Sequence, residues 1–225
     1  MTRLNLFRNP LQRWFNKGAR PTVPVKALHE RDRRRMVRHF LSLERSDRIL
    51  RFGSFMSDEQ VTKYVNGIDF NRDMVFGVYN RVFRLAAVGH LAFAPRQPAS
   101  EGVTEKDRVA EFGVSVLKSA RGLGIGSKLF ERANIVCRNN DVDTLYMHCL
   151  SSNQTMMHIA KKAGMEIHRD YGEADAYLKL GPADPASVLQ EAMQEQLATI
   201  DYALKANVRR ATKLLDRLPG RQPKE

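Results

Sequence analysis

The hydrophobic pattern changes from alternation to helical spacing in the middle of the chain. Residues 111–117 place Phe112, Val114 and Val116 at every second position, which predicts a half-buried strand. Beyond residue 128, apolar residues recur every three or four positions, as on one face of a helix: Leu129, Ala133, Val136 and Cys137. The glycine-rich segment 120–128 is therefore predicted to be a strand-to-helix turn.

Similar patterns predict the remaining elements. In chain order they are a strand at 22–28, helices at 29–44 and 57–66, a hairpin of strands at 74–79 and 82–93, a loop at 95–106, a strand at 145–150, a helix after Asn153, and strands at 166–169 and 174–180. Ser57 is a favourable N-cap for the second helix. These patterns predict a domain that mixes strands and helices.

A long amphipathic helix is predicted after Gly181-Pro182, with Ser187 as its N-cap. Its apolar residues recur at steps of three and four: Leu189, Met193, Leu197, Ile200, Leu204, Val208, Ala211, Leu215 and Leu218. A stripe of this length is covered either by its own domain or by the same helix of a second subunit. The near-heptad spacing favours a homodimer.

Composition predicts a cytoplasmic, mostly single-domain protein. With 225 residues, of which 43% are hydrophobic, the chain can bury one core and carry terminal extensions. We divide it into a basic arm (1–21), a domain (22–181), the amphipathic helix (182–219) and a frayed tail (220–225). No apolar segment is long enough to cross a membrane, and no signal peptide pattern is present.

Cysteine and histidine spacing predicts neither a disulfide framework nor a metal site. The two cysteines, Cys137 and Cys149, stand in apolar runs, which favours buried thiols in a reducing compartment. The six histidines form no pair at the helical spacing of metal ligands.

The net charge of +12 is concentrated near the N-terminus. Residues 1–51 contain 14 Lys or Arg against 4 Asp or Glu, which accounts for most of the excess. The basic arm is also amphipathic, and such a segment binds an anionic membrane or nucleic acid, or docks on its own domain or on a partner subunit. We favour docking, so that nucleic acid is an unlikely partner.

The segment Arg121-Gly122-Leu123-Gly124-Ile125-Gly126-Ser127 carries the most specific chemistry. The first N–H groups of a helix have no internal partner and favour an anion. Glycine lets the backbone approach that anion closely. The turn therefore predicts a phosphate cradle, although a plain glycine turn is the simpler alternative. A dinucleotide fold would need more βα units, and a Walker loop would need the order of Ser127 and Lys128 reversed.

This turn resembles motif A of the GCN5-related N-acetyltransferase (GNAT) family, in which Arg or Gln, two residues, Gly, one residue, and Gly or Ala follow one another. Arg121, Gly124 and Gly126 match it. Ser152-Asn153 and the apolar residues after it look like motif B of the family. Together the resemblances cover residues 82–180.

The resemblance implies an α+β fold with a mixed, mostly antiparallel sheet, and acetyl-CoA as the co-substrate. It implies that the turn holds the diphosphate, that the strand end contacts the pantetheine arm through its backbone, and that the asparagine of motif B contacts the pantetheine or thiol end. The cofactor-binding residues would be Val116, Leu117, Arg121, Gly122, Leu123, Gly124, Ile125, Gly126, Ser127 and Asn153.

The reaction would move an acetyl group to a primary amine by direct attack in a ternary complex. Ala110-Glu111-Phe112 looks similar to a strand of members that acetylate protein lysines, so the acceptor is a protein lysine or a small molecule. An amine of pKa near 10.4 is protonated at neutral pH, and deprotonating it costs about 4.6 kcal/mol. In related enzymes a glutamate on this strand takes the proton, often through water. We therefore expect Glu111 to be partly desolvated or to act through water; alternatively, it only pairs with a nearby arginine or caps a strand end.

One departure from the family concerns the general acid. Many members carry a tyrosine seven residues after the motif B asparagine, where this chain has Ala160. The departing thiolate must then take its proton from water or from another tyrosine such as Tyr171 or Tyr177, or leave without one. The departure also supports a second reading, an acetyl-CoA-binding sensor or adaptor with weak catalysis. A third reading is a nucleic-acid-associated protein that binds through its basic arm.

Overall fold

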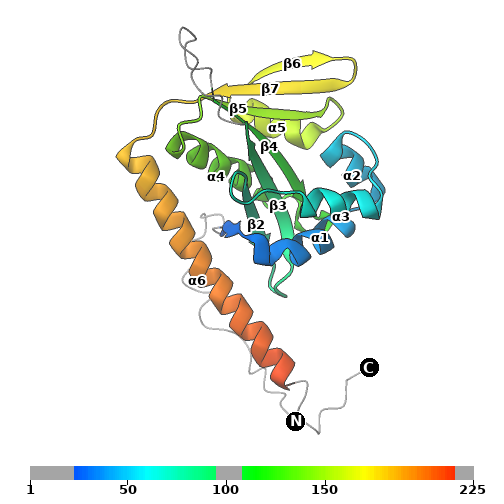
Figure 1. The fold of residues 1–225 in the computed structure, drawn as a ribbon, viewed down its shortest axis with the longest axis vertical. Helices are drawn as coiled ribbons and strands as arrows, with labels where there is room; N and C mark the ends of the chain where they lie inside the picture. Colours follow the sequence, from blue (N-terminus) through cyan, green and yellow to red (C-terminus); the bar gives the residue numbers. More distant parts are fainter. Residues whose placement is uncertain (1–22, 95–107, 216–225) are drawn as a thin grey trace, which may run out of the picture.

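A seven-stranded mixed sheet forms the centre of the computed structural model, which describes residues 23–94 and 108–215 (Figure 1). Its strands are β1 (Lys26–Leu28), β2 (Met74–Tyr79), β3 (Leu85–Phe93), β4 (Val109–Val116), β5 (Thr144–Leu150), β6 (Glu166–Asp170) and β7 (Glu173–Lys179), in the order β1-β2-β3-β4-β5-β7-β6. Only β4 and β5 are parallel neighbours in this sheet. The expected α+β fold is confirmed. The predictions for 1–21, 95–106 and 220–225 lie outside the described residues.

The two parallel strands separate halfway along their length. Their pairing ends where Glu111 of β4 faces Tyr146 of β5, although β4 continues to Val116 and β5 to Leu150. On their other edges both strands stay paired, β4 with β3 and β5 with β7. The sheet therefore opens between them, and the backbone groups on the facing edges are left for other partners.

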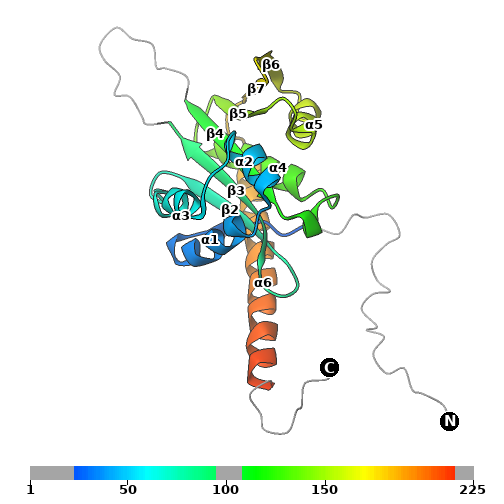
Figure 2. The ribbon, with the colours of Figure 1, turned by 90° about the vertical axis from the view of Figure 1, so that its right-hand side faces the viewer.

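Helices cover both faces of the sheet (Figure 2). One face carries the 3₁₀ turn η2 (Glu30–Asp32), α1 (Arg33–Leu41), α2 (Arg45–Phe52) and α3 (Asp58–Asn66), and the other carries α4 (Ile125–Asn139) and α5 (Gln154–Lys162). Each face has its own apolar core, because adjacent residues of a strand point to opposite sides. Helix α2 packs against both β4 and β5, beside the opening.

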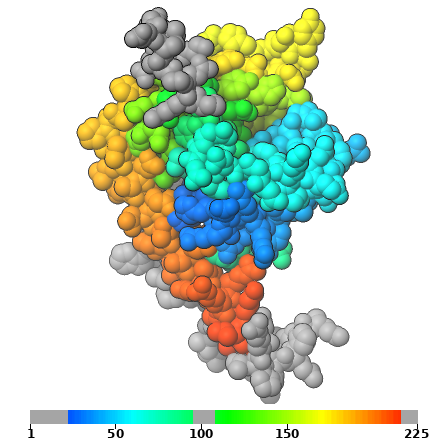
Figure 3. Space-filling view, in the orientation of Figure 1, coloured from blue at the N-terminus to red at the C-terminus, as the bar shows by residue number. Residues whose placement is uncertain are grey.

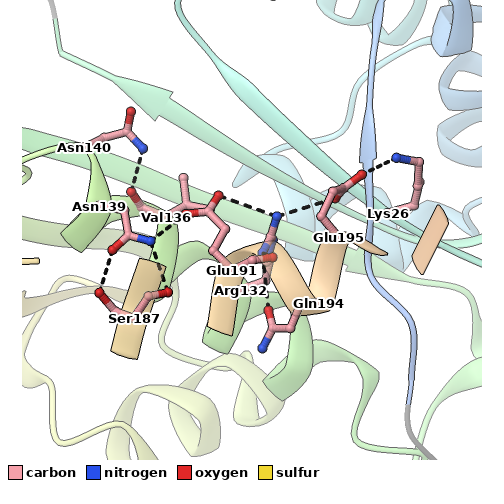
Figure 4. Close-up of polar contacts among 9 residues, drawn as sticks. All are labelled: Lys26, Arg132, Val136, Asn139, Asn140, Ser187, Glu191, Gln194 and Glu195. Atoms are coloured by element: carbon pink, nitrogen blue, oxygen red, sulfur yellow. Dashed lines mark hydrogen bonds and ion pairs between the residues drawn. The ribbon is translucent and has the colours of Figure 1, made fainter. Parts of the chain in front are cut away.

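The C-terminal helix α6 (Pro185–Leu215) crosses the domain diagonally, and its last turns project past the domain (Figures 1 and 3). It packs against α4 and β1. The buried Arg132 of α4 donates to the backbone of Glu191 and lies beside the carboxylates of Glu191 and Glu195, and Lys26 of β1 also pairs with Glu195 (Figure 4). One face of α6 is thus fixed to the domain by polar contacts.

Two sequence predictions about helix positions are wrong. The segment 29–44 is not a single helix: it contains η2 and α1, and α1 ends at Leu41, where the Ser42 N–H bonds back to three carbonyls. Helix α2, which begins at Arg45, was not predicted. Helix α6 begins at Pro185, two residues before Ser187. Asp184 caps it by accepting the Ser187 N–H at 2.7 Å, and Ser187 accepts the Asp184 N–H in return.

Two strands are also shorter than predicted. β1 begins at Lys26 rather than at residue 22, and Pro24, which has no N–H to donate to a strand partner, stands before it. β3 begins at Leu85, because Asn80 holds the preceding residues in a turn by accepting the N–H groups of Val82 and Arg84. The N-cap prediction for Ser57 is confirmed, since Ser57 and Gln60 form a reciprocal capping box.

Candidate active site

The glycine turn leads from β4 into the N-terminus of α4, as the sequence pattern predicted. A short 3₁₀ turn, η3 (Lys118–Ala120), follows β4, and α4 begins at Ile125 with Gly124 as its N-cap. Gly122 and Gly124 have φ values of 76° and 73°, a left-handed conformation that favours glycine. In the described part of the chain, no residue accepts a hydrogen bond from the N–H groups of residues 122–127. These amides are therefore available to an anion.

The side chains of the turn divide between solvent and the protein interior. Leu123 is exposed, Ser127 is half-buried and Ile125 is buried in the core. A Cβ on Gly126 would lie 3.1 Å from Ile159 Cδ1 on α5, so the glycine lets the two helices approach each other. Ile125 and Gly126 thus pack the N-terminus of α4 against the protein interior, while its first N–H groups have no partner in the described chain.

Arg121 connects the turn to α2 and to the end of β4. Its guanidinium forms an ion pair with Asp47 of α2 at 2.6 Å, and its Nε donates to the carbonyl of Val116 at 3.3 Å. Val116 and Leu117 are half-buried, and the Leu117 N–H donates to Ala86 of β3. These three predicted residues therefore lie together at the opening between β4 and β5.

Asn153 lies on the other side of the opening, after β5. Its side-chain oxygen accepts the Met156 N–H at 3.2 Å, so Asn153 is the N-cap of α5. Its amide nitrogen donates to the Leu50 carbonyl of α2 at 3.3 Å and has a second N–H. Arg121 and Asn153 are thus both tied to α2, which bridges the two sides.

Glu111 lies where the pairing of β4 and β5 ends. It shares one face of β4 with Gly113 and Ser115, and its side chain is exposed. No hydrogen bond or ion pair joins Glu111 to another described residue. The expected partial desolvation is therefore not found, and neither is the alternative pairing with an arginine. A carboxylate in this position can exchange protons with water.

A chain of polar side chains that the sequence did not predict lies on this face of the sheet. Arg51 of α2 donates to Tyr64 Oη at 2.8 Å, Tyr64 Oη lies 2.8 Å from His90 Nδ1, and His90 Nε2 lies 3.2 Å from a carboxylate oxygen of Asp73. Since the carboxylate accepts from Nε2, the neutral ring accepts the Tyr64 hydroxyl at Nδ1. The hydrogen bonds then run in one direction, from Arg51 to Asp73.

The groups in this chain have shifted acidities. Burial raises the pKa of Tyr64, and the charges of Glu111 and Asp73 act in the same direction. Burial also lowers the pKa of His90, as does the charge of Arg51, while Asp73 opposes them. At neutral pH Tyr64 therefore keeps its proton and His90 is uncharged.

A second contact that the sequence did not predict joins α1 to β4. His39 of α1 donates from Nδ1 to the Leu85 carbonyl at 3.1 Å, and its Nε2 accepts the Ser115 hydroxyl at 2.7 Å. Burial lowers the pKa of His39 to about 4. The signal in the sequence was a histidine beside Phe40 on the apolar face of α1, where it needs a polar partner.

The position of the usual tyrosine is occupied by a small buried side chain. Ala160 is buried in the core beneath the sheet. Tyr171 is fully exposed in the turn between β6 and β7, and Tyr177 lies beside Tyr146 on the face that carries Glu111. Burial, followed by a hydrogen bond to Asp175, raises the pKa of Tyr146. The charge of Glu111 also contributes to raising the pKa of Tyr146 and the pKa of Tyr64.

Among the described residues, no group of three or more His, Cys, Asp or Glu is placed to hold a metal ion. No helix within 23–94 or 108–215 is long and apolar enough to cross a membrane. Cys137 and Cys149 are buried free thiols, as predicted, and burial raises the pKa of Cys137 to about 12.

A comparison with protein families decides what this arrangement belongs to. Residues 9–165 match the model described as "Acetyltransferase (GNAT) family", which covers more than half of the chain. The chain belongs to the GNAT family. Among curated proteins, no sequence matches it. The family predicted from Arg121, Gly124 and Gly126 is confirmed.

Solved structures of other GNAT proteins share the fold. The GNAT domain of S. lividans PAT is 20% identical, with a TM-score of 0.56 over 69% of this chain and 89% of that chain. A phosphinothricin acetyltransferase from Sinorhizobium meliloti, in complex with AcCoA, is 13% identical, with a TM-score of 0.55 over 73% and 95% of the two chains. A GNAT acetyltransferase from Streptococcus pneumoniae is 14% identical, with a TM-score of 0.52 over 71% and 100%. At these identities the likeness shows the GNAT fold alone.

Proposed function

We propose that this GNAT protein transfers an acetyl group from acetyl-CoA to a primary amine by direct attack in a ternary complex. The single observation that carries the proposal is the row of unoccupied N–H groups at residues 122–127. They lie at the start of α4, where the helix dipole adds positive potential. A diphosphate is the kind of anion that such a turn binds.

Each residue near the opening has a distinct role in this proposal. The turn from Arg121 to Ser127 binds the diphosphate, with the Arg121 guanidinium shared between that anion and Asp47. The backbone of Val116 and Leu117 and the second amide N–H of Asn153 contact the pantetheine arm. When bound, acetyl-CoA supplies an acetyl group activated as a thioester. Because pairing with β5 ends at Glu111, the carboxylate lies at the mouth of the opening.

Glu111 removes the proton from the incoming ammonium through a water molecule. Its exposure and its lack of a protein partner in the described chain support this route over direct contact in a dry pocket. A backbone N–H near Val116 stabilises the negative charge that develops on the acetyl oxygen. Because Ala160 stands where the usual tyrosine would be, the thiolate takes its proton from water, from Tyr64 or from Tyr146.

The proposal is tested by acetyl-CoA binding to variants of the turn. Gly124→Asp places a carboxylate among the amides, and we expect calorimetry to show at least about a 100-fold loss of affinity. Gly124→Asn imposes similar backbone strain without the charge and should lose far less. Gly164→Asp is the matched control, because Gly164 has the same φ of 73° at the far end of α5. Equal binding by Gly124→Asp and wild type would contradict the cradle.

An acetyl-CoA sensor with weak catalysis is the second candidate, and the buried Ala160 favours it. Thiol release from acetyl-CoA separates the two. An enzyme releases thiol at a rate that depends on the added amine, whereas a sensor binds acetyl-CoA and releases none above the rate of hydrolysis.

A further inference from the structure

Arg51 is a half-buried cation with no acidic partner in the described chain. It stands in the last turn of α2, and the single hydrogen bond from its guanidinium goes to the Tyr64 hydroxyl. The guanidinium also lies over the rings of Phe52 and Tyr64, 5.0 and 5.6 Å from their centroids. These contacts fix its plane but leave its charge uncompensated.

Arg48, one helical turn earlier, shows how this fold satisfies a structural arginine. Its guanidinium donates to the carbonyls of Leu41 and Met56 and to the Asp58 carboxylate at 2.6 Å. Arg132 likewise lies beside two glutamates. A charge removed from water is costly unless it is paired. Arg51 differs from both, which indicates that its anion is not part of the described chain.

The position of Arg51 relates it to the chemistry at β4. A Cβ on Gly113 would lie 2.6 Å from Nη2 of Arg51, so the guanidinium rests directly on the backbone of β4 at a residue without a side chain. Gly113 is two residues beyond Glu111 and on the same face. Two residues of a strand span about 6.6 Å. The Arg51 guanidinium, which can bind an anion, and the Glu111 carboxylate, which can take a proton from an ammonium, therefore lie near each other at the opening between β4 and β5.

We propose that Arg51 binds a carboxylate of the acceptor, so that the acceptor is a small amino acid with a free carboxylate. This inference rests on the proposed acetyl transfer. The planar guanidinium binds a carboxylate through two parallel hydrogen bonds and orients it. The amine of the same molecule then lies near Glu111. A lysine within a protein has its carboxyl group in a peptide bond and offers no such anion.

The reaction with this acceptor balances without another reagent. The ammonium loses one proton to Glu111 through water, and the amine nitrogen forms a bond to the acetyl carbon. The bond from that carbon to sulfur breaks, and the sulfur leaves with the electron pair as a thiolate. The products are an N-acetylated amino acid and CoA. Arg51 takes no part in these bond changes and acts by binding and orienting the acceptor.

The test compares free acids with their esters. Thiol release from acetyl-CoA is measured with the twenty protein amino acids and 4-aminobutyrate, each beside its methyl ester, and with lysine peptides. We expect at least one acid to exceed its ester at least tenfold in kcat/KM. Arg51→Gln should bring that ratio close to one by lowering only the value for the acid, and Arg51→Lys should keep part of the preference. Arg45→Gln, an exposed change on the same helix, is the control.

Three results would overturn the inference: a ratio near one in the wild type, a ratio that Arg51→Gln leaves intact, or an equal loss of acid and ester activity in Arg51→Gln whose melting temperature matches the wild type. Calorimetry of the same acids and esters with CoA-saturated protein gives a readout that needs no turnover. Acid-selective binding without thiol release would contradict the proposed transfer and keep the carboxylate site. Turnover of lysine peptides alone would support the proposed transfer and contradict the carboxylate site.

Discussion

At the scale of single residues, the candidate site combines groups that the sequence identifies with groups that only the fold brings near. Gly122 and Gly124 could be predicted, because a strand pattern before them and a helix pattern after them define the turn. Arg51 and Tyr64 could not be, since they lie 60 and 47 positions before Glu111 in the sequence and reach β4 only through the packing of α2 and α3.

Replacing Glu111 tests its proposed role as the base. Glu111→Gln removes the proton acceptor, so we expect kcat to fall about 100-fold or more at neutral pH, while acetyl-CoA binds as before. The deficit should shrink as pH rises, because hydroxide and free amine replace the base. Steady-state thiol release between pH 6 and 9 checks this. Glu30→Gln, at an exposed glutamate of η2, is the control, and unchanged turnover in Glu111→Gln would rule out the assignment.

At the scale of elements, the strands and helices with a strong apolar period were predictable, and the connections were not. The helix at 58–66 has a capping box, and the strand at 109–116 alternates clearly. Helix α2 was not predicted, because only Ile49, Leu50 and Phe52 of its eight residues are apolar and Glu44, at its N-cap, is not a favoured capping residue. That error matters for function, since α2 supplies Asp47 and Arg51, which contact the turn and β4.

The contact between α6 and α4 should contribute to the stability of the domain. The Arg132 side chain is only 4% exposed and lies beside Glu191 and Glu195. Arg132→Met would remove the cation that Glu191 pairs with and leave Lys26 as the cation beside Glu195. We expect a loss of about 2–3 kcal/mol in the free energy of unfolding, measured with urea.

Arg138, on the same helix, provides the comparison. Its partner Asp184 has a side chain 49% exposed, and exposed ion pairs contribute about 0–1 kcal/mol. Arg138→Met should therefore be nearly neutral. If the two variants lost the same stability, the Arg132 contact would not be what holds α6 to α4.

At the scale of the whole molecule, α6 leaves an apolar stripe uncovered. Six of its residues have exposed fractions between 55% and 62%: Leu189, Met193, Leu197, Ile200, Leu204 and Val208. They follow one another at steps of four, four, three, four and four, an eleven-residue repeat rather than the near-heptad expected. The stripe faces away from the residues that contact α4, so packing across its own described domain does not cover it.

The expected homodimer remains a prediction, and the charges of α6 specify its geometry. Residues 185–203 contain no Lys or Arg, whereas 204–215 contain four and no Asp or Glu. Antiparallel pairing of two α6 helices keeps the basic halves of the two copies apart, which a parallel pair cannot do. A two-fold axis near Ile200 produces this arrangement and closes the assembly at two copies.

Sedimentation of the full chain tests this pairing. We expect a dimer for the wild type and a monomer for the double variant Leu197→Glu with Leu204→Glu, because four carboxylates would be buried at the interface. Thr199→Glu adds a charge to an exposed position on another side of α6 and should leave the dimer intact. A wild-type monomer at micromolar concentration, or a double variant that still sediments as a dimer, would show that the stripe does not pair two copies. Because the pairing lies apart from the opening between β4 and β5, acetyl-CoA should bind the monomeric variant with unchanged affinity.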